Sequence, residues 1–514
     1  MTKLLQRLRA LDPALLQDLR RGIEKESLRV RPEGPLATTP HPSALGSSLT
    51  HAYITTDFSE AQLELITGVH SRAQACLKEL TEIHQVAYRR IGDEVLWCAS
   101  MPCFLPEDDA IPIAQYGSSN RARLKTVYRT GLSHRYGRRM QAISGIHYNF
   151  SLPDEAWRAL GADGPNDGYF ALIRNFRRHC WLILYLFGAS PAVCRSFVEG
   201  RVHELLPLKG GTLYLPEGTS LRMGPLGYRS DAQAALAVSY NSLESYAASL
   251  RDALTRPYPL YEAIGIRDGA DQYRQLATSL LQLEAEFYGT IRPKRRVEPG
   301  ERPLHALLER GVEYVEVRLM DLDPFSPIGI TEDTIRFLDM FLLHCVLRES
   351  PPDDAREIAA VGRNLNRVAA RGRKPGLQLE REGTRVGLAG WGAQVLSECE
   401  PIAAALDAAH GGDAHRKVLA HAQAALTDPG SVPSARVIDE MVRNYDSSYT
   451  SFVLDHSIRH RKTLLGLPLS TEVEQRFEQL ARQSLEEQRR MEAADDVPFE
   501  TYRQHYLSEG LLVE

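Results

Sequence analysis

Four short stretches of the sequence alternate polar and apolar residues, which is the pattern of β-strands with one buried face. In GIEKESLRV (22–30), Glu24 and Glu26 lie two positions apart and therefore share one face of a strand. Two neighbouring carboxylates repel each other unless a cation lies between them, although a pair on a solvated edge strand would show the same pattern. The alternation recurs in ITTDFSEAQLELITGV (54–69), SGIHYNFSLP (144–153) and VEYVEVRLMDLDPFSP (312–327).

These stretches predict a mostly antiparallel sheet whose charged, concave face forms a site and whose apolar, convex face is covered by helices. Helical periodicity indicates helices within 72–91, 167–190 and 231–287. After residue 331 the chain is rich in Ala, Leu, Arg and Glu, which favours helix. No low-complexity linker and no internal repeat divides the chain. We therefore expect an α+β protein built as one continuous body.

The composition excludes several classes of protein. The 514 residues carry a formal net charge of −5 and no basic or acidic tail, so we expect no nucleic-acid partner. Segment 1–22 is amphipathic, unlike a signal peptide, and the apolar run 180–194 is too short and too interrupted to span a membrane, so we expect a cytoplasmic protein. The seven cysteines show no CxxC spacing, and we expect free thiols.

The polar faces of the predicted strands carry residues that bind hard divalent cations. Mg²⁺ and Mn²⁺ prefer carboxylate oxygens and accept an occasional imidazole. Any one of these acids could equally be a solvated surface residue, so the hypothesis depends on the whole set. We expect two or three Mg²⁺ or Mn²⁺ ions to be bound by Glu24, Glu26, Asp57, Glu64, His147 and Glu316.

The sequence lacks the common nucleotide-binding motifs. No GxxxxGK[ST] motif occurs, and the glycines of GLAGWG (387–392) have the wrong spacing for a dinucleotide fingerprint, so we expect a loop there. Phosphates would have to be held by metals and basic side chains. The candidates are IRPKRR (291–296) and Arg318, although a basic run is more often a solvated face.

A collinear series of motifs resembles one known family. In chain order, the motifs are GIEKESLRV, ITTDFSEAQLELIT, SMPCFLP, IAQYGSSN, ISGIHYNFSLP, YLFGASPAVC, TSLRMGPLGY, YGTIRPKRR, VEYVEVRLMDLDPFSPIG and RGRKPGL. They are similar to the signature stretches of the γ-proteobacterial glutamate–cysteine ligases and cover most of residues 18–380. The resemblance implies a glutamine-synthetase-like fold, in which a bent, mostly antiparallel sheet forms a funnel. It implies a catalytic body over 1–380 and a mostly helical C-terminal part over 381–514 that packs on the same body.

The same resemblance implies an activity and assigns roles to matching residues. The activity would be ATP-dependent ligation of the γ-carboxylate of glutamate to the amine of cysteine through a γ-glutamyl phosphate, the first step of glutathione biosynthesis. Arg318 and Glu316 would be catalytic, with Arg318 near the transferred phosphoryl group, and the acidic residues and histidine named above would bind the metals. Glutamate would be held by Gln141, Asn149 and Arg222. Cysteine would be enclosed by Phe58, Tyr128, Tyr228 and Tyr288.

Three alternatives stay open on the sequence. A metal-dependent hydrolase would use similar acids without a separate amino-acid pocket, and a non-catalytic helical scaffold would explain only residues 331–514. A ligase that joins glutamate to a different amine would share the carboxylate-activating residues. The expected partners are the small molecules glutamate, cysteine and ATP, with no nucleic acid and no membrane. The oligomeric state is left open, and a monomer is compatible with the sequence.

Overall fold

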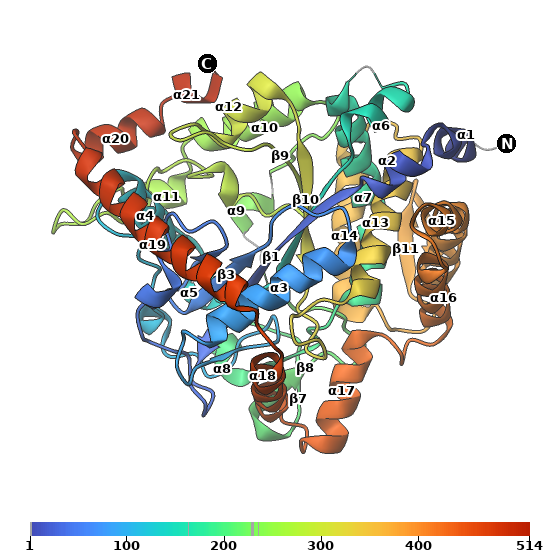
Figure 1. Cartoon of the computed structure of the whole chain (residues 1–514), viewed down its shortest axis with the longest axis horizontal. Helices are drawn as coiled ribbons and strands as arrows, with labels where there is room; N and C mark the ends of the chain where they lie inside the picture. The colour runs from blue at the N-terminus through green and yellow to red at the C-terminus, as the bar shows by residue number, and fades with distance from the viewer. Residues whose placement is uncertain (1–2, 163, 228–230, 235, 514) are drawn as a thin grey trace.

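An antiparallel β-sheet forms the centre of the molecule (Figure 1). The computed structural model describes residues 3–162, 164–227, 231–234 and 236–513. Within them the strand order is β2–β3–β1–β5–β10–β9, β4 pairs with the C-terminal end of β1, and all these pairings are antiparallel. The strands are β1 (Arg20–Val30), β2 (Ile54–Thr56), β3 (Gln62–Ile66), β4 (Val95–Leu96), β5 (Ile146–Ser151), β9 (Ile291–Lys294) and β10 (Tyr314–Met320).

Helices cover the apolar face of the sheet. Ile23, Tyr148 and Val317 are fully buried there in one large hydrophobic cluster. The helices α3 (Ala73–Tyr88) and α7 (Pro165–Phe187) contact the strands, and α13 (Glu332–Leu347) packs against both helices. A buried polar contact also joins α13 to the sheet, because the hydroxyl of Tyr148 donates a hydrogen bond of 2.6 Å to Asp339.

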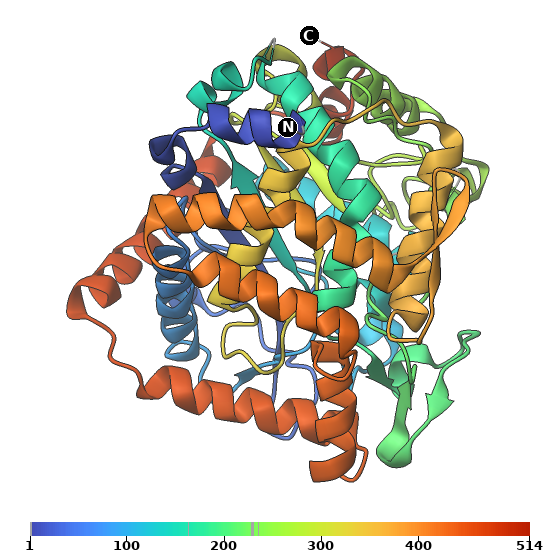
Figure 2. The ribbon, with the colours of Figure 1, turned by 90° about the vertical axis from the view of Figure 1, so that its right-hand side faces the viewer.

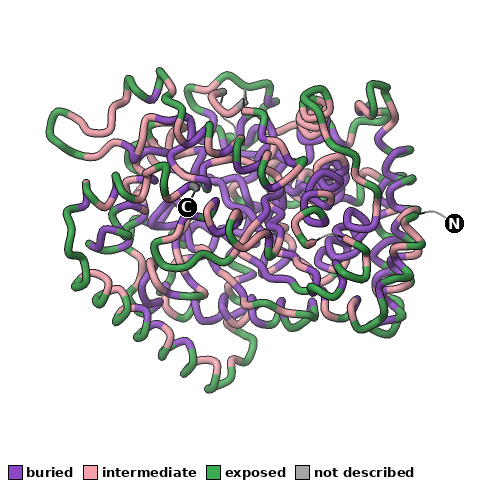
Figure 3. Tube along the Cα trace, turned by 90° about the horizontal axis from the view of Figure 1, so that it is seen from above, coloured by how far each residue is buried: buried purple, intermediate pink, exposed green. Residues whose placement is uncertain are grey.

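Two further helices form an outer layer over α7 and α13. The helices α15 (Leu388–His410) and α16 (Ala414–Thr427) pack against each other and against α13, and they cross the front of the view in Figure 2. Buried residues gather in the middle of the molecule and on the inner faces of its helices, while exposed residues follow the periphery (Figure 3). Within the described chain, no helix is both long enough and apolar enough to cross a membrane.

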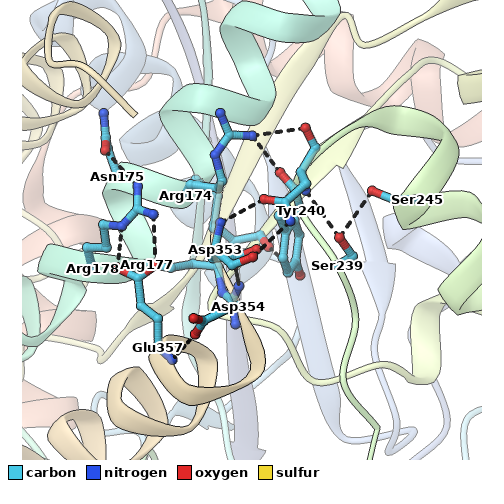
Figure 4. A network of polar contacts seen from close by, with 12 residues as sticks. Arg174, Asn175, Arg177, Arg178, Ser239, Tyr240, Ser245, Asp353, Asp354 and Glu357 are labelled. Carbon is cyan, nitrogen blue, oxygen red and sulfur yellow. Dashed lines mark hydrogen bonds and ion pairs between the residues drawn. The ribbon is translucent and has the colours of Figure 1, made fainter. Parts of the chain in front are cut away.

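A polar network attaches α14 (Ala355–Arg371) to α7 (Figure 4). Arg178 on α7 forms an ion pair with Glu357 on α14 at 2.6 Å, and Arg177 forms one with Asp353 at 3.0 Å. Arg174 donates hydrogen bonds to the carbonyl oxygens of Tyr240 and the next residue. Because arginine can donate to several acceptors at once, one turn of α7 fixes two neighbouring segments.

The C-terminal helices begin next to α16 and run beneath the sheet to the side of the molecule opposite α15 and α16 (Figure 1). They are α17 (Pro433–Asn444), α18 (Tyr449–Gly466), α19 (Thr471–Ala494) and α20 (Phe499–Tyr506), and α19 forms a long diagonal strap in Figure 1. At the end of this strap, Glu492 accepts a hydrogen bond from the backbone N–H of Ser118 at 2.9 Å, and Asp495 accepts one from that of Asn120 at 2.5 Å. These contacts hold the N-terminus of α4 (Asn120–Tyr136).

Short elements complete the described chain. A small sheet has the strand order β6 (Ala192–Cys194), β8 (Thr212–Tyr214) and β7 (Leu206–Pro207), and β11 (Gln378–Arg381) pairs with β12 (Thr384–Gly387). The remaining α-helices are α1 (Lys3–Ala10), α2 (Pro13–Gln17), α5 (Arg138–Gln141), α6 (Asp154–Ala159), α8 (Arg195–Val198), α9 (Asp231–Ala234), α10 (Leu243–Thr255), α11 (Pro259–Ile264), α12 (Pro303–Arg310) and α21 (Gly510–Val513).

The predicted α+β class, with a mostly antiparallel sheet flanked by helices, is confirmed. Three local expectations are wrong. Helix does not extend through 265–283, and GLAGWG begins α15 instead of forming a loop, because its apolar residues pack on the core. Cys103 and Cys194 form a disulfide, so they are not free thiols; the fold brings together two residues separated by 91 positions, a proximity that the sequence does not encode locally. The other five cysteines are free and buried.

Candidate active site

The register of the sheet places the predicted polar residues side by side. Glu24 of β1 is paired with His147 of β5, and Glu26 of β1 is paired with Glu64 of β3. On the other side of β5, Glu316 of β10 is paired with Asn149. Directly paired residues project on the same side of a sheet, so side chains from four strands converge on one face.

Three of these side chains form a compact group that suits a divalent cation. Ligand atoms of Glu24, His147 and Glu316 all lie within 4.8 Å of one another. His147 Nδ1 lies 3.1 Å from a carboxylate oxygen of Glu24, and the other oxygen of Glu24 accepts a hydrogen bond of 2.9 Å from Asn149. Two carboxylates and an imidazole form a donor set that Mg²⁺ or Mn²⁺ accepts.

Two of the remaining acids, Glu26 and Glu64, lie in surroundings that disfavour their ionisation. Burial raises the pKa of Glu26 to about 8, and the neighbouring charge of Asp57 adds to this effect. Burial also raises the pKa of Glu64 well above its ordinary value, and Glu24 and Asp57 raise it further. A bound cation would reverse this effect, because an opposite charge favours the ionised carboxylate. The residues present therefore fit a divalent-metal site.

Basic side chains balance Glu316. Burial raises its pKa, but Lys294 and Arg318 outweigh burial and hold the pKa of Glu316 well below its usual range. Lys294 Nζ lies 3.0 Å from one oxygen of Glu316, and Arg318 Nη1 lies 2.8 Å from the other. Arg292, on the same strand as Lys294, is paired with Glu316 in the register of the sheet. Arg292 and Lys294 of IRPKRR thus line the site instead of forming a solvated face.

A cavity of about 280 Å³ joins the acidic residues to a group of aromatic side chains. A larger cavity of about 450 Å³ lies behind the sheet, but in the described chain it contains none of the predicted site residues. The predicted residues that line the smaller cavity are Glu24, Glu26, Asp57, Phe58, Glu64, Tyr128, Gln141, His147, Arg222, Tyr288, Glu316 and Arg318. Asn149 does not line it but contacts Glu24, and Tyr228 lies outside the described residues.

One end of this cavity is aromatic. Phe58 and Tyr128 belong to one buried hydrophobic cluster, and Gln141 donates a hydrogen bond of 2.8 Å to the hydroxyl of Tyr288. Sequence reasoning missed Arg129, which lines the same end and donates a hydrogen bond to the carbonyl of Asp57. It lies on helix α4, where the strand alternation that identified the acids gives no signal.

Arg222 lines the same cavity. Its Nη2 donates a hydrogen bond of 2.8 Å to the carbonyl oxygen of Arg318, and its Nη1 lies 3.8 Å from a carboxylate oxygen of Asp321. The guanidinium also packs closely on the backbone, since a Cβ atom added at Gly145 would lie 2.1 Å from Nη2. A glycine is therefore needed opposite this arginine.

Comparisons with known proteins identify the family of the chain. A family model described as glutamate–cysteine ligase matches residues 5–368. The chain is 47% identical over 506 residues to a glutamate–cysteine ligase from Alcanivorax borkumensis, covering 96% of each chain. It is 50% identical over 502 residues to one from Azotobacter vinelandii, covering 95% of this chain and 94% of that one.

The fold is also similar to solved structures of related enzymes. The crystal structure of a glutamate–cysteine ligase from Francisella tularensis in complex with AMP matches with a TM-score of 0.91 and 35% identity, covering 96% of this chain and 98% of that chain. A bifunctional glutathione synthetase from Pasteurella multocida matches with a TM-score of 0.70 and 27% identity, covering 90% of this chain and 55% of that one. The chain belongs to the glutamate–cysteine ligase family.

Proposed function

We propose that this protein is an ATP-dependent carboxylate–amine ligase that joins the γ-carboxylate of L-glutamate to the amine of L-cysteine. The products are γ-glutamylcysteine, ADP and phosphate, and the reaction is the first step of glutathione biosynthesis, which we place in the cytoplasm. The observation that carries the proposal is a single cavity, in a chain of this family, with an acidic, metal-compatible end and an aromatic end. A hydrolase would not need the second end.

We assign the metal ions to the acidic end. Glu24, His147 and Glu316 would hold one ion, and Glu26, Asp57 and Glu64 would hold one or two more. The ions would supply positive charge that offsets the triphosphate of ATP and aligns its γ-phosphoryl group. Mg²⁺ and Mn²⁺ both suit this donor set.

The basic residues near Glu316 would stabilise the transferred phosphoryl group. Glu316 holds Lys294 and Arg318 by ion pairs, so their charges have fixed positions before ATP binds. Preorganised charge of this kind lowers the barrier without any reorganisation during the reaction. Arg318 would face the equatorial oxygens. We assign the α-carboxylate of glutamate to Arg222, with Gln141 and Asn149 as further polar contacts.

The chemistry needs no protein nucleophile. The γ-carboxylate of glutamate attacks the γ-phosphorus of ATP, ADP leaves, and a γ-glutamyl phosphate forms. The cysteine amine then attacks the acyl carbon, the amine proton is lost, and phosphate leaves as the amide bond forms. Phe58, Tyr128 and Tyr288 would enclose the cysteine side chain and exclude water from the acyl phosphate.

We propose that residues 381–514 belong to the same functional body as residues 1–380. Phe499 of α20 lies in the hydrophobic cluster that contains Phe58 and Tyr128. The C-terminal part thus supports the aromatic end of the cavity.

Steady-state release of ADP across a panel of amino acids tests the function. We expect release only with both glutamate and an amine acceptor, with cysteine giving the highest kcat/KM. L-2-Aminobutyrate, which carries a methyl group in place of the thiol, should also react, because the attacking atom is nitrogen. ADP release without an acceptor, or better use of an unrelated amine, would contradict the proposal. Tyr128→Ala should raise the cysteine KM more than the glutamate KM.

A further inference from the structure

Asp321 lies directly behind Arg222. It follows the last residue of β10, and its side chain has no exposure to solvent, while that of Arg222 is 2% exposed. Arg222 lines the cavity of the active site, whereas Asp321 does not; Asp321 lines the separate cavity of about 450 Å³ on the other side. Arg222 therefore links Asp321 to the active-site cavity.

The carboxylate of Asp321 is itself held rigidly. One oxygen accepts a hydrogen bond of 2.9 Å from the backbone N–H of Ala189, and the other accepts one of 3.1 Å from the hydroxyl of Ser220. Ala189 follows the end of α7, and Ser220 lies two residues before Arg222. The Asp321 carboxylate is thus held by hydrogen bonds from two separate segments of the chain. Its negative charge therefore has a fixed position relative to the Arg222 guanidinium.

Three neighbours help to fix the position of the guanidinium. The carbonyl oxygen of Arg318 accepts from Nη2, the backbone at Gly145 leaves no room for a side chain against it, and Asp321 lies 3.8 Å from Nη1. The carbonyl of Arg318 and the backbone at Gly145 carry no charge, whereas Asp321 carries a negative charge. An arginine recognises a carboxylate through the plane and direction of its N–H groups, so a rotation of the guanidinium weakens that recognition.

We propose that Asp321 is a positioning residue that orients the Arg222 guanidinium toward a carboxylate of the glutamate substrate. The inference rests on the proposed function, because that proposal assigns Arg222 to glutamate. Asp321 touches neither substrate nor ATP. It supplies a countercharge on the side of the buried guanidinium that faces away from the cavity, and it sets the direction in which the arginine faces.

Asp321→Asn is the first test, because it removes the charge and keeps the shape. We expect the glutamate KM to rise about 10-fold or more, with the KM values for cysteine and ATP changed by less than about threefold. The matched control is Asp323→Asn, the same substitution two residues along the chain. Asp323 accepts a hydrogen bond from the backbone N–H of Phe325 and does not line the active-site cavity, so its glutamate KM should stay unchanged.

A double-mutant cycle separates positioning from a general structural role. If Asp321 acts through Arg222, then Asp321→Asn in an Arg222→Lys background should raise the glutamate KM by less than about threefold beyond the single Arg222→Lys variant. Additive effects of the two substitutions would overturn the proposal. So would an Asp321→Asn variant whose three substrate KM values rise equally.

Two further results must be distinguished: an Asp321→Asn variant that does not fold, and a failure of the proposed function itself. If Asp321→Asn does not fold, Asp321→Glu keeps the charge and displaces it by one methylene, and the same selective rise in the glutamate KM is expected; an unchanged value would overturn the proposal. If the wild-type chain releases no ADP with glutamate and cysteine, the proposed function itself fails. If the wild type is active and Arg222→Lys alone raises the glutamate KM, while Asp321→Asn does not, only the role of Asp321 is refuted.

Discussion

The carboxylates of the active site differ in how their charges are balanced. Lys294 and Arg318 outweigh burial and keep the pKa of Glu316 low, so this residue is ionised without any ligand. Burial raises the pKa of Glu64, and the surrounding carboxylates of Glu24 and Asp57 raise it further. An added divalent cation would therefore favour the ionisation of Glu64.

Glu64→Gln should raise the metal concentration needed for half-maximal activity by about 10-fold or more, because one charged ligand is lost from a site built from several. Activity titrated with MgCl₂ at saturating ATP measures this change. Glu313→Gln is the control, since Glu313 lies outside the cavity, contacts Arg295 and accepts from the backbone of Arg296. An unchanged magnesium requirement in Glu64→Gln would remove this residue from the metal site.

At this scale the alternation of polar and apolar residues identifies site residues on strands but gives no signal for those on helices or beyond strand ends. The alternation of polar and apolar residues places Glu24, His147 and Glu316 on one face because a strand repeats every two residues. The alternation did not identify Arg129 or Asp321, because Arg129 lies on a helix and Asp321 follows the end of a strand. Their proximity to the site depends on packing between segments distant in sequence.

At the scale of elements, the end of the chain supports the aromatic part of the site. Phe499 of α20 is buried in the cluster of Phe58 and Tyr128, and Arg123 of α4 lies over its ring at 4.3 Å. The family model ends at residue 368, yet this later helix reaches the cavity wall. The motifs of the first 380 residues could not indicate this contact.

Phe499→Ala should raise the cysteine KM several-fold and leave the glutamate KM nearly unchanged, because the cavity it leaves loosens α4 and with it Tyr128 and Arg129. Steady-state kinetics with each substrate varied in turn measures the difference. The control is Phe477→Ala in α19, whose ring packs on Tyr53 at 5.6 Å, away from the cavity. Both variants should lose stability, but equal kinetic effects would refute the special role of Phe499.

A second prediction concerns the contact between α13 and α15. Burial raises the pKa of Glu398, but His344 and Arg348 outweigh burial and lower it to about 2 from an ordinary value of 4.5. Because the pKa in the folded state is lowered, the stabilisation is complete above about pH 4.5 and is lost as the pH falls toward 2. Glu398→Gln should therefore cost about 1–2 kcal/mol at pH 7, and the difference should shrink below pH 4.5.

Urea unfolding of both proteins at several pH values measures this difference. The matched control is Glu400→Gln, two residues further along α15, where the side chain is exposed. A difference between Glu398→Gln and wild type that stays constant from pH 7 to pH 3 would show that the charge of Glu398 contributes nothing.

At the scale of the whole molecule, packing holds distant parts of the chain together. The disulfide between Cys103 and Cys194 joins two of these parts covalently. The sequence predicted the sheet and its helical cover, because hydrophobic alternation determines which face is buried. It did not predict the disulfide between Cys103 and Cys194, since cysteine spacing alone carries no information about pairing at long range. The division between 1–380 and 381–514 stays a prediction.

Reduction of the Cys103–Cys194 bond should lower the free energy of unfolding by about 2–4 kcal/mol, because the closed loop restricts the unfolded chain. Chemical unfolding with and without dithiothreitol measures this change. A Cys103→Ser, Cys194→Ser double variant should match the reduced wild type and should not respond to dithiothreitol. A response in the double variant would assign the effect to a disulfide formed in solution among the five remaining cysteines.

The order of the strands has a consequence for synthesis on the ribosome. β1, β3 and β5 bring Glu24, Glu26, Glu64 and His147 into the sheet, but β9 and β10 emerge much later with Lys294 and Arg318. Until then the nascent chain holds a cluster of acids without those balancing cations, and pairing between such distant segments is slow. The pairing of β10 with β5 is therefore the step that brings Arg318, and with β9 also Lys294, to the acids already in the sheet.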